Sequence, residues 1–166
     1  HYAKGWHATP TIGAVAAGAA VAHLFGLEER AFLSALAIAA AQAGGLQRNF
    51  GTMAKPLQAG LAAQAGVRAA RLAMAGLEGP ADVLAGDNGF IAVFEGGADA
   101  ELELDVEAAV AGLSRKLFAC CYLAHRPVAA AIRLHGEGAS SLLSDPAIRV
   151  EVEVPPGCLK ALTIDI

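Results

Sequence analysis

The sequence is poor in charged residues, aromatic residues and cysteine. Only 17% of its 166 residues are charged and 5% are aromatic, and the formal net charge is −4. It contains no basic cluster and no face of interleaved basic and aromatic residues, so a nucleic-acid partner is not expected. Its three cysteines, two of them adjacent, fit neither a disulfide framework nor a zinc-binding spacing. This cysteine usage favours a reducing, cytoplasmic location.

The sequence also lacks an apolar run long enough to cross a bilayer. The longest runs, such as residues 12–24, fall short of the roughly 20 residues that a transmembrane helix needs, so no membrane partner is expected. The first residues contain neither an initiator methionine nor the apolar core of a secretory signal. We therefore expect the chain to be an internal piece of a longer cytoplasmic protein.

Small apolar residues are abundant. Hydrophobic residues make up 55% of the chain, much of this share is alanine, and there are 19 glycines. Because such residues let helix backbones approach closely, the composition predicts a tightly stacked helical bundle. Small side chains also provide little buried volume, so we expect neighbouring chain or a partner subunit to cover part of the surface.

Apolar periodicity and Gly/Pro punctuation predict mostly helices. Three long ones are expected at residues 12–25, 27–43 and 57–75. Gly26 and Gly76 are placed to end the first and the third, and Thr9 or Thr11 is placed to cap the first. Shorter helices are expected at residues 79–84, 101–113 and 122–134, with residues 90–94 left open and residues 116–121 extended or irregular.

One segment near the end follows a different pattern. Residues 148–154, IRVEVEV, alternate apolar and polar side chains and predict a β-strand. A single strand cannot stand alone, so we expect a second, α+β domain to begin here, and residues 159–166 are either a second strand or a cut end. The predicted fold is mainly α, with one domain at residues 1–140 and the start of another at residues 141–166.

The stretch at residues 49–60, NFGTMAKPLQAG, holds a lysine directly before a proline. A residue before proline is disfavoured in a helix, so Lys55 is expected just outside a helix that begins near Pro56. An ammonium group beside the unpaired N–H groups of a helix start would bind anions. From chemistry alone, however, a solvated loop lysine is the commoner case.

Other polar residues are equally open on chemistry alone. The sequence has no nucleotide-binding glycine motif in a suitable context and no zinc-protease motif. His7 precedes a helix start, where packing or capping is the commoner role, and Lys116 would by default lie at the surface. No sequence signal activates Cys120 or Cys121 as a nucleophile. The residues by themselves therefore predict a helical protein but no reaction.

Three motifs together resemble the MmgE/PrpD family, and the resemblance covers nearly the whole chain. They are W-H-x-T at residues 6–9, G-T-M-x-K-P-L-x-A-G at residues 51–60 and C-C-Y-x-x-H at residues 120–125. The family includes 2-methylcitrate dehydratase, cis-aconitate decarboxylase and iminodisuccinate epimerase. The resemblance implies a large helical domain, a smaller α+β lid domain, a homodimer, a small di- or tricarboxylate substrate, and neither metal nor organic cofactor.

The resemblance also implies roles for particular residues. Lys55 would clamp a substrate carboxylate, and His7 would bind substrate or assist proton transfer; these two are the catalytic candidates. The substrate-binding candidates are Lys116, Gln58, Cys121 and Tyr122. Many relatives have histidine where this chain has Gln58, so polar binding is kept but titration is lost. The decarboxylase branch has histidine where this chain has Cys121, which argues against decarboxylation.

The resemblance thus implies a cofactor-free lyase that dehydrates a 2-methylcitrate-like polycarboxylate after abstracting a proton next to a carboxylate. Two alternatives stay open: an epimerase or isomerase of a small dicarboxylate, and a non-catalytic, truncated helical module. Family members are far longer than this chain, and a preceding part is expected to supply an aspartate and a histidine of the site. This piece alone is therefore expected to be inactive.

Overall fold

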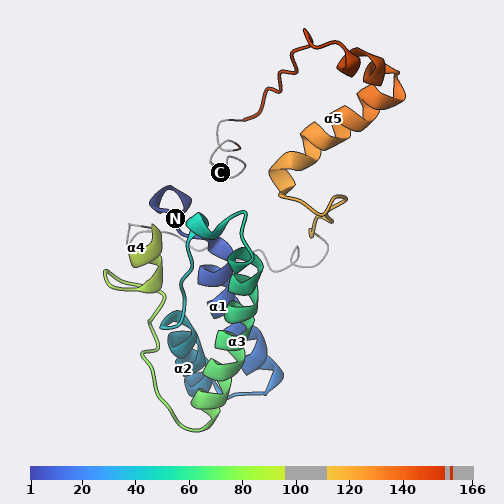
Figure 1. Cartoon of the computed structure of the whole chain (residues 1–166). Coiled ribbons are helices and arrows are strands. Elements are labelled where there is room, and N and C mark those ends of the chain that lie inside the picture. The colour runs from blue at the N-terminus through green and yellow to red at the C-terminus, as the bar shows by residue number, and fades with distance from the viewer. Residues whose placement is uncertain (96–111, 156–157, 159–166) are drawn as a thin grey trace. The chain divides into compact units, whose positions relative to one another are not determined.

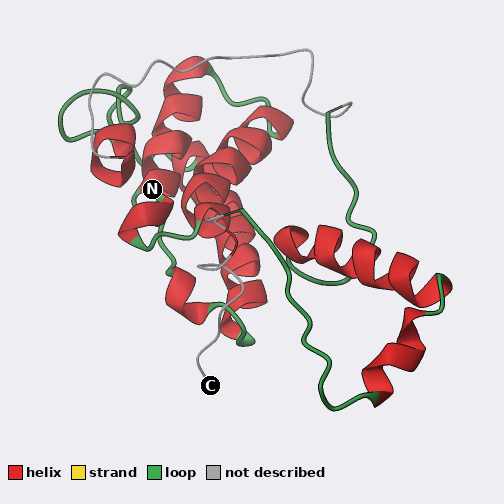
Figure 2. Cartoon of the chain, turned by 90° about the horizontal axis from the view of Figure 1, so that it is seen from above, coloured by secondary structure: helices red, strands yellow, loops and turns green. Residues whose placement is uncertain are grey.

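The computed structural model describes residues 1–95, 112–155 and 158. The chain divides into two compact units, His1–Glu103 and Leu104–Ile166, and each is described by itself. Helices and their connecting loops make up the described residues, in which no strand longer than a single β-bridge is present (Figure 2). The mainly α fold predicted from the sequence is confirmed.

Three helices pack side by side in the first unit (Figure 1). They are α1 (Ala8–Leu24), α2 (Glu29–Ala40) and α3 (Ala54–Met74). All three long helices were predicted, but α1 and α3 begin three or four residues earlier than expected. Pro10 and Pro56 each occupy the third position of their helix, where the missing N–H costs no intrahelical hydrogen bond. A proline in the first turn therefore does not mark the first residue of the helix.

The two ends of α1 differ in how well the sequence predicted them. The predicted threonine cap is wrong: the N-cap is His7, without a side-chain cap, and Thr11 lies inside the helix. The predicted end is confirmed, because Gly26 has φ +64° and the Leu27 N–H donates to the Ala22 carbonyl at 3.1 Å. This is the hydrogen bond of a Schellman motif, which favours glycine at the left-handed position.

Alanine and glycine build the core of this unit. The buried apolar residues include Ala14, Ala22, Ala35, Ala69 and Ala70, and the largest fully buried side chain is that of Thr11. Helix backbones approach closely as predicted: a Cβ added at Gly66 of α3 would lie 2.7 Å from the Gly18 nitrogen of α1. Close backbone packing therefore takes the place of large interdigitating side chains.

Several large apolar side chains of the first unit remain exposed. On and beside α3, the exposed fractions are 88% for Met53, 59% for Leu57 and 49% for Leu61. Exposed apolar residues that cluster in this way are characteristic of surfaces that meet another part of a protein. Cover by neighbouring chain or a partner subunit stays a prediction.

The segment after α3 departs from the sequence prediction. Residues 79–80 are irregular and residues 81–84 form turns instead of the predicted helix. The Val83 and Leu84 carbonyls accept from the N–H groups of Phe90 and Ile91, so they are not used within a helix of their own. The apolar segment whose type was left open is a helix, α4 (Phe90–Glu95), and its Phe94 ring meets the Trp6 ring at 5.0 Å between centroids. The helix predicted at residues 101–113 lies almost entirely outside the described residues.

The second unit contains η3 (Tyr122–Ala124), α5 (His125–Gly136) and η4 (Ala139–Ser144). The helix predicted at residues 122–134 is confirmed, with a 3₁₀ first turn, and residues 116–121 are irregular as predicted. The strand predicted at residues 148–154 is not formed, since the described residues offer it no partner strand. Residues 159–166 lie outside the described residues, and the predicted domain boundary at residue 141 stays a prediction.

None of the helices within the described residues combines the length and the apolar character needed to traverse a lipid bilayer.

Candidate active site

His7 lies where an irregular segment joins α1. Just before it, Trp6 forms an antiparallel bridge with Leu46, and the His7 N–H donates to the Gly45 carbonyl at 3.1 Å. Gly45 has φ +108°, and a Cβ there would overlap the Pro10 ring and lie 3.3 Å from the Gln58 side-chain carbon. Only glycine fits such a position without strain. The absence of a side chain at Gly45 therefore lets its backbone approach His7 closely enough for this hydrogen bond.

The His7 side chain is buried against α3. It is 5% exposed, and its Nδ1 lies 2.6 Å from Oε1 of Gln58, which is 6% exposed. The Gln58 Nε2 in turn donates to the Leu46 carbonyl at 3.3 Å. Both polar ends of the Gln58 amide are therefore used within the protein, as buried polar groups require. The substrate-binding role expected for Gln58 stays a prediction.

Phe50 connects His7 with Lys55. The His7 ring meets the Phe50 ring edge to face, with centroids 4.8 Å apart and planes at 82°. The Lys55 ammonium lies over the same ring, 4.2 Å from its centroid, which is the geometry of a cation–π contact. Among residues 1–95, no carboxylate lies within ion-pair distance of this ammonium. The lysine is thus held by an aromatic ring and leaves its charge open to an anion.

The local structure around Lys55 corrects one sequence prediction. Lys55 is the second residue of α3 and does not lie outside the helix. The N–H groups of this first turn are not unpaired either: Ala54 donates to Thr52 Oγ1 and Lys55 to the Thr52 carbonyl, both at 3.2 Å. Pro56 has no N–H to offer. Any anion bound here is therefore held by the ammonium and not by the helix start.

The remaining candidates belong to the second unit. Lys116 is exposed, and its ammonium donates to the Cys120 carbonyl at 3.2 Å. This hydrogen bond connects two ends of the irregular segment that precedes η3. Cys121 is a half-buried free thiol, and the following Tyr122 is 58% exposed. Lys116, Cys121 and Tyr122 are close in sequence and share one local region. Their predicted substrate-binding roles stay predictions.

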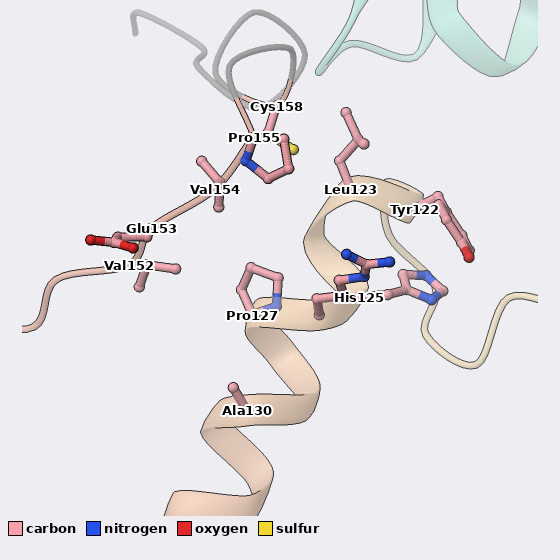
Figure 3. Close-up of a pocket in the computed structure, with 11 residues that line it drawn as sticks. Tyr122, Leu123, His125, Pro127, Ala130, Val152, Glu153, Val154, Pro155 and Cys158 are labelled. Carbon is pink, nitrogen blue, oxygen red and sulfur yellow. The ribbon is translucent and has the colours of Figure 1, made fainter.

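Tyr122 also lines a pocket of about 500 Å³ within the second unit (Figure 3). One wall is the start of α5, including Pro127, and the other is the segment that contains Val152 and Cys158. His125 lies beside Tyr122, with ring centroids 5.3 Å apart, and its Nε2 donates to the Phe118 carbonyl at 3.1 Å. The lining is mainly apolar, with few groups that could bind a polycarboxylate.

Sequence reasoning missed the connecting role of Phe50 and Gly45. Phe50 lies inside the stretch singled out for Lys55, but its spacing gave no sign that it touches both a lysine and a histidine 43 residues earlier in the chain. Gly45 follows the helix predicted at residues 27–43 and was not among the site candidates. A pair of glycines after a helix is a common stop signal, so the close approach to Pro10 left no distinctive trace.

Comparison with known proteins agrees with the motifs. Residues 1–103 match the family model described as the MmgE/PrpD N-terminal domain. The chain is 38% identical over 144 residues to cis-aconitate decarboxylase of Aspergillus terreus, which covers 80% of this chain and 29% of that protein. It is 40% identical over 91 residues to cis-aconitate decarboxylase of Homo sapiens, which covers 55% of this chain and 19% of that protein.

The chain spans less than a third of the length of these curated relatives. The family match extends over more than half of the chain and coincides with the first compact unit. The resemblance inferred from the motifs is therefore confirmed. This protein belongs to the MmgE/PrpD family.

Proposed function

We propose that this chain forms part of the active site of a lyase that acts on a small polycarboxylate. The observation that carries the proposal is the contact of both His7 and Lys55 with the Phe50 ring. Through this ring, the His7 imidazole, which can transfer protons, and the Lys55 ammonium lie near each other. The ammonium has no carboxylate partner among residues 1–95. Removal of a proton next to a carboxylate needs both kinds of group.

In the proposed reaction the Lys55 ammonium binds a substrate carboxylate. When the neighbouring C–H proton is removed, negative charge spreads onto that carboxylate, and a preorganised cation lowers the energy of this state. The electrons of the broken C–H bond then form the new C=C bond, and the hydroxyl group of the substrate leaves with a proton as water. His7 binds the substrate or transfers one of these protons.

The proposed substrate is a 2-methylcitrate-like tricarboxylate, and decarboxylation is a second candidate. Dehydration is favoured by Cys121, which replaces the histidine that the resemblance implies for decarboxylases. Decarboxylation is favoured by the relatives, since those from Aspergillus terreus and Homo sapiens are both named cis-aconitate decarboxylase. Epimerisation of a dicarboxylate needs the same proton abstraction without loss of a group, and a non-catalytic module needs none of it.

The remaining features of the proposal concern the assembled protein. We propose a cytoplasmic homodimer without metal or organic cofactor, in which Lys116, Cys121 and Tyr122 add to the substrate site. The exposed apolar residues beside α3 support a larger assembly, and the three free cysteines support a reducing location.

The test is an assay of a complete enzyme that contains this segment. The enzyme is given 2-methylcitrate, with formation of the alkene followed by absorbance, and separately cis-aconitate, with release of carbon dioxide measured. We expect alkene formation, and we expect it to fall strongly in His7→Ala and Lys55→Ala. Carbon dioxide release alone would assign the enzyme to decarboxylation, whereas turnover of neither compound nor of a dicarboxylate epimer would overturn the proposal.

A further inference from the structure

The contact between Gln58 and His7 determines which nitrogen of the histidine carries the proton. Both side chains are more than nine-tenths buried, and Nδ1 of His7 lies 2.6 Å from Oε1 of Gln58. At that distance one of the two atoms must donate a hydrogen and the other must accept it. Either nitrogen of a neutral imidazole can carry the proton, so the answer depends on the orientation of the Gln58 amide.

The Leu46 carbonyl fixes that orientation. It lies 3.3 Å from the far end of the Gln58 amide, and a carbonyl oxygen can only accept a hydrogen bond. The NH₂ group of Gln58 must therefore face Leu46, because the opposite orientation would bring two acceptor oxygens together. The amide oxygen of Gln58 is then the atom that faces His7.

The orientation of the Gln58 amide determines which ring nitrogen of His7 carries the hydrogen. An amide oxygen cannot donate, so Nδ1 of His7 must carry the hydrogen, and Nε2 of the neutral ring keeps its lone pair. Nε2 has no hydrogen-bond partner among the described residues. Because none of their fully buried side-chain nitrogen or oxygen atoms lacks a partner, Nε2 itself is not fully enclosed by these residues. Nε2 is therefore the ring nitrogen that is left for a ligand.

The backbone of His7 is fixed as well. Its N–H donates to the Gly45 carbonyl at 3.1 Å, and its carbonyl accepts from the Thr11 hydroxyl at 3.1 Å. The ring is also held on one side by the edge-to-face contact with Phe50. A ring held in this way has little freedom to turn over and exchange its two nitrogens.

We propose that Gln58 is a positioning residue that holds His7 as the Nδ1–H tautomer, with Nε2 presented to the substrate as the proton acceptor. This inference rests on the proposed function and deepens it, because it names the reacting atom of His7. Gln58 acts through His7 and makes no contact with the substrate. After Nε2 takes a proton, Nδ1–H still donates to Gln58, so the charged ring keeps its place.

The tautomer can be read without substrate by NMR of the ¹⁵N-labelled 166-residue chain. Long-range ¹H–¹⁵N correlations distinguish a protonated from an unprotonated ring nitrogen, and His7→Ala identifies the His7 signals by their loss. We expect protonated Nδ1 and unprotonated Nε2 in the neutral ring. This pattern is diagnostic, since the Nε2–H form dominates in free imidazole side chains. A His7 in the Nε2–H form would overturn the proposal.

Two substitutions at residue 58 test the cause. Gln58→Met keeps the shape but removes both hydrogen bonds, and His7 is expected to move toward the Nε2–H form. Gln58→Glu keeps an acceptor beside Nδ1 and loses the donor to the Leu46 carbonyl. Nδ1 is expected to stay protonated in this variant even if Gln58→Met does not fold. Gln42→Met is the matched control, because Gln42 is exposed just after the end of α2 and its amide donates to the Ile38 carbonyl of that helix. An unchanged tautomer in Gln58→Met, or an Nδ1 without its hydrogen in Gln58→Glu, would contradict the proposal.

Kinetics separate positioning from substrate binding. In a complete enzyme, Gln58→Met is expected to lower kcat by about 10-fold or more, a part of what a positioned acid or base contributes, with KM nearly unchanged. A raised KM with an unchanged kcat would instead assign Gln58 to substrate binding. If His7→Ala leaves turnover unchanged, the proposed function fails by itself, because the tautomer is measured in the absence of substrate.

Discussion

The ammonium of Lys55 lies 4.2 Å from the centre of the Phe50 ring and caps its face. Lys55 is half-buried, and among residues 1–95 no carboxylate neutralises it. The face of an aromatic ring attracts a cation through its quadrupole but does not cancel the positive charge. The arrangement therefore positions a lysine while keeping it available for an anionic ligand, which a salt bridge would not do.

A double-mutant cycle measures this contact in the free protein. Lys55→Met and Phe50→Leu are combined, and their effects on the free energy of unfolding are compared with those of the single variants. We expect a coupling of about 0.5–1 kcal/mol, the usual strength of a partly exposed cation–π pair. Chemical denaturation at low salt is the measurement. A coupling of zero would mean that Phe50 does not position the lysine.

Lys55 itself is expected to matter for turnover. In a complete enzyme that contains this segment, Lys55→Ala should lower kcat/KM for the polycarboxylate by about 10²-fold, the scale of removing one preorganised charge stabiliser. Steady-state kinetics measure this loss. Lys4→Ala is the control, because Lys4 is exposed and forms no ion pair among the described residues, and its kinetics should match the wild type. Near-normal turnover of Lys55→Ala would refute the carboxylate clamp.

The helical framework was largely predictable from the sequence because its signals are local. The end of α1 at Gly26 depends on hydrogen bonds within six residues, so it can be predicted from the local sequence without knowledge of the fold. Lys55 was placed wrongly because a preference against helix before proline is weak. The helix gains packing along 21 residues of α3, and this outweighs the local cost at its second residue.

The site was less predictable because its contacts are distant in sequence. His7 and Gln58 are 51 residues apart, and no spacing rule relates a residue before one helix to a residue inside another. The predicted strand at residues 148–154 failed for a related reason, since alternation shows only that a strand could pair. Local patterns thus identified candidate residues but not their partners.

Two glycines of α3 separate the effects of packing and of helix propensity. A Cβ at Gly66 would lie 2.5 Å from the Ala17 carbonyl carbon, whereas one at Gly60 would meet nothing within 4 Å. We expect Gly66→Ala to lower the free energy of unfolding by about 2 kcal/mol or more, because backbone atoms of α1 must move. Gly60→Ala should raise it by about 0.5–1 kcal/mol. Equal effects in thermal unfolding would refute the close crossing of α1 and α3.

Gly45 offers the corresponding test at the site. At φ +108°, an alanine would be strained, and its Cβ would overlap the Pro10 ring and press on the Gln58 side chain. We expect Gly45→Ala to lower the free energy of unfolding by about 2 kcal/mol or more. Gly44→Ala is the matched neighbour: its added Cβ meets nothing within 4 Å, and its effect should stay within about 0.5 kcal/mol.

The Gly45→Ala substitution should also change the tautomer of His7. Its carbonyl accepts the His7 N–H at 3.1 Å, and the segment that continues from it carries the Leu46 carbonyl that orients Gln58. Displacement of this segment should therefore loosen the tautomer of His7, which NMR reports as a mixture of both forms. Gly44→Ala should keep the single Nδ1–H form. A Gly45→Ala protein with wild-type stability and an unchanged tautomer would show that the close approach of Gly45 does not hold the site together.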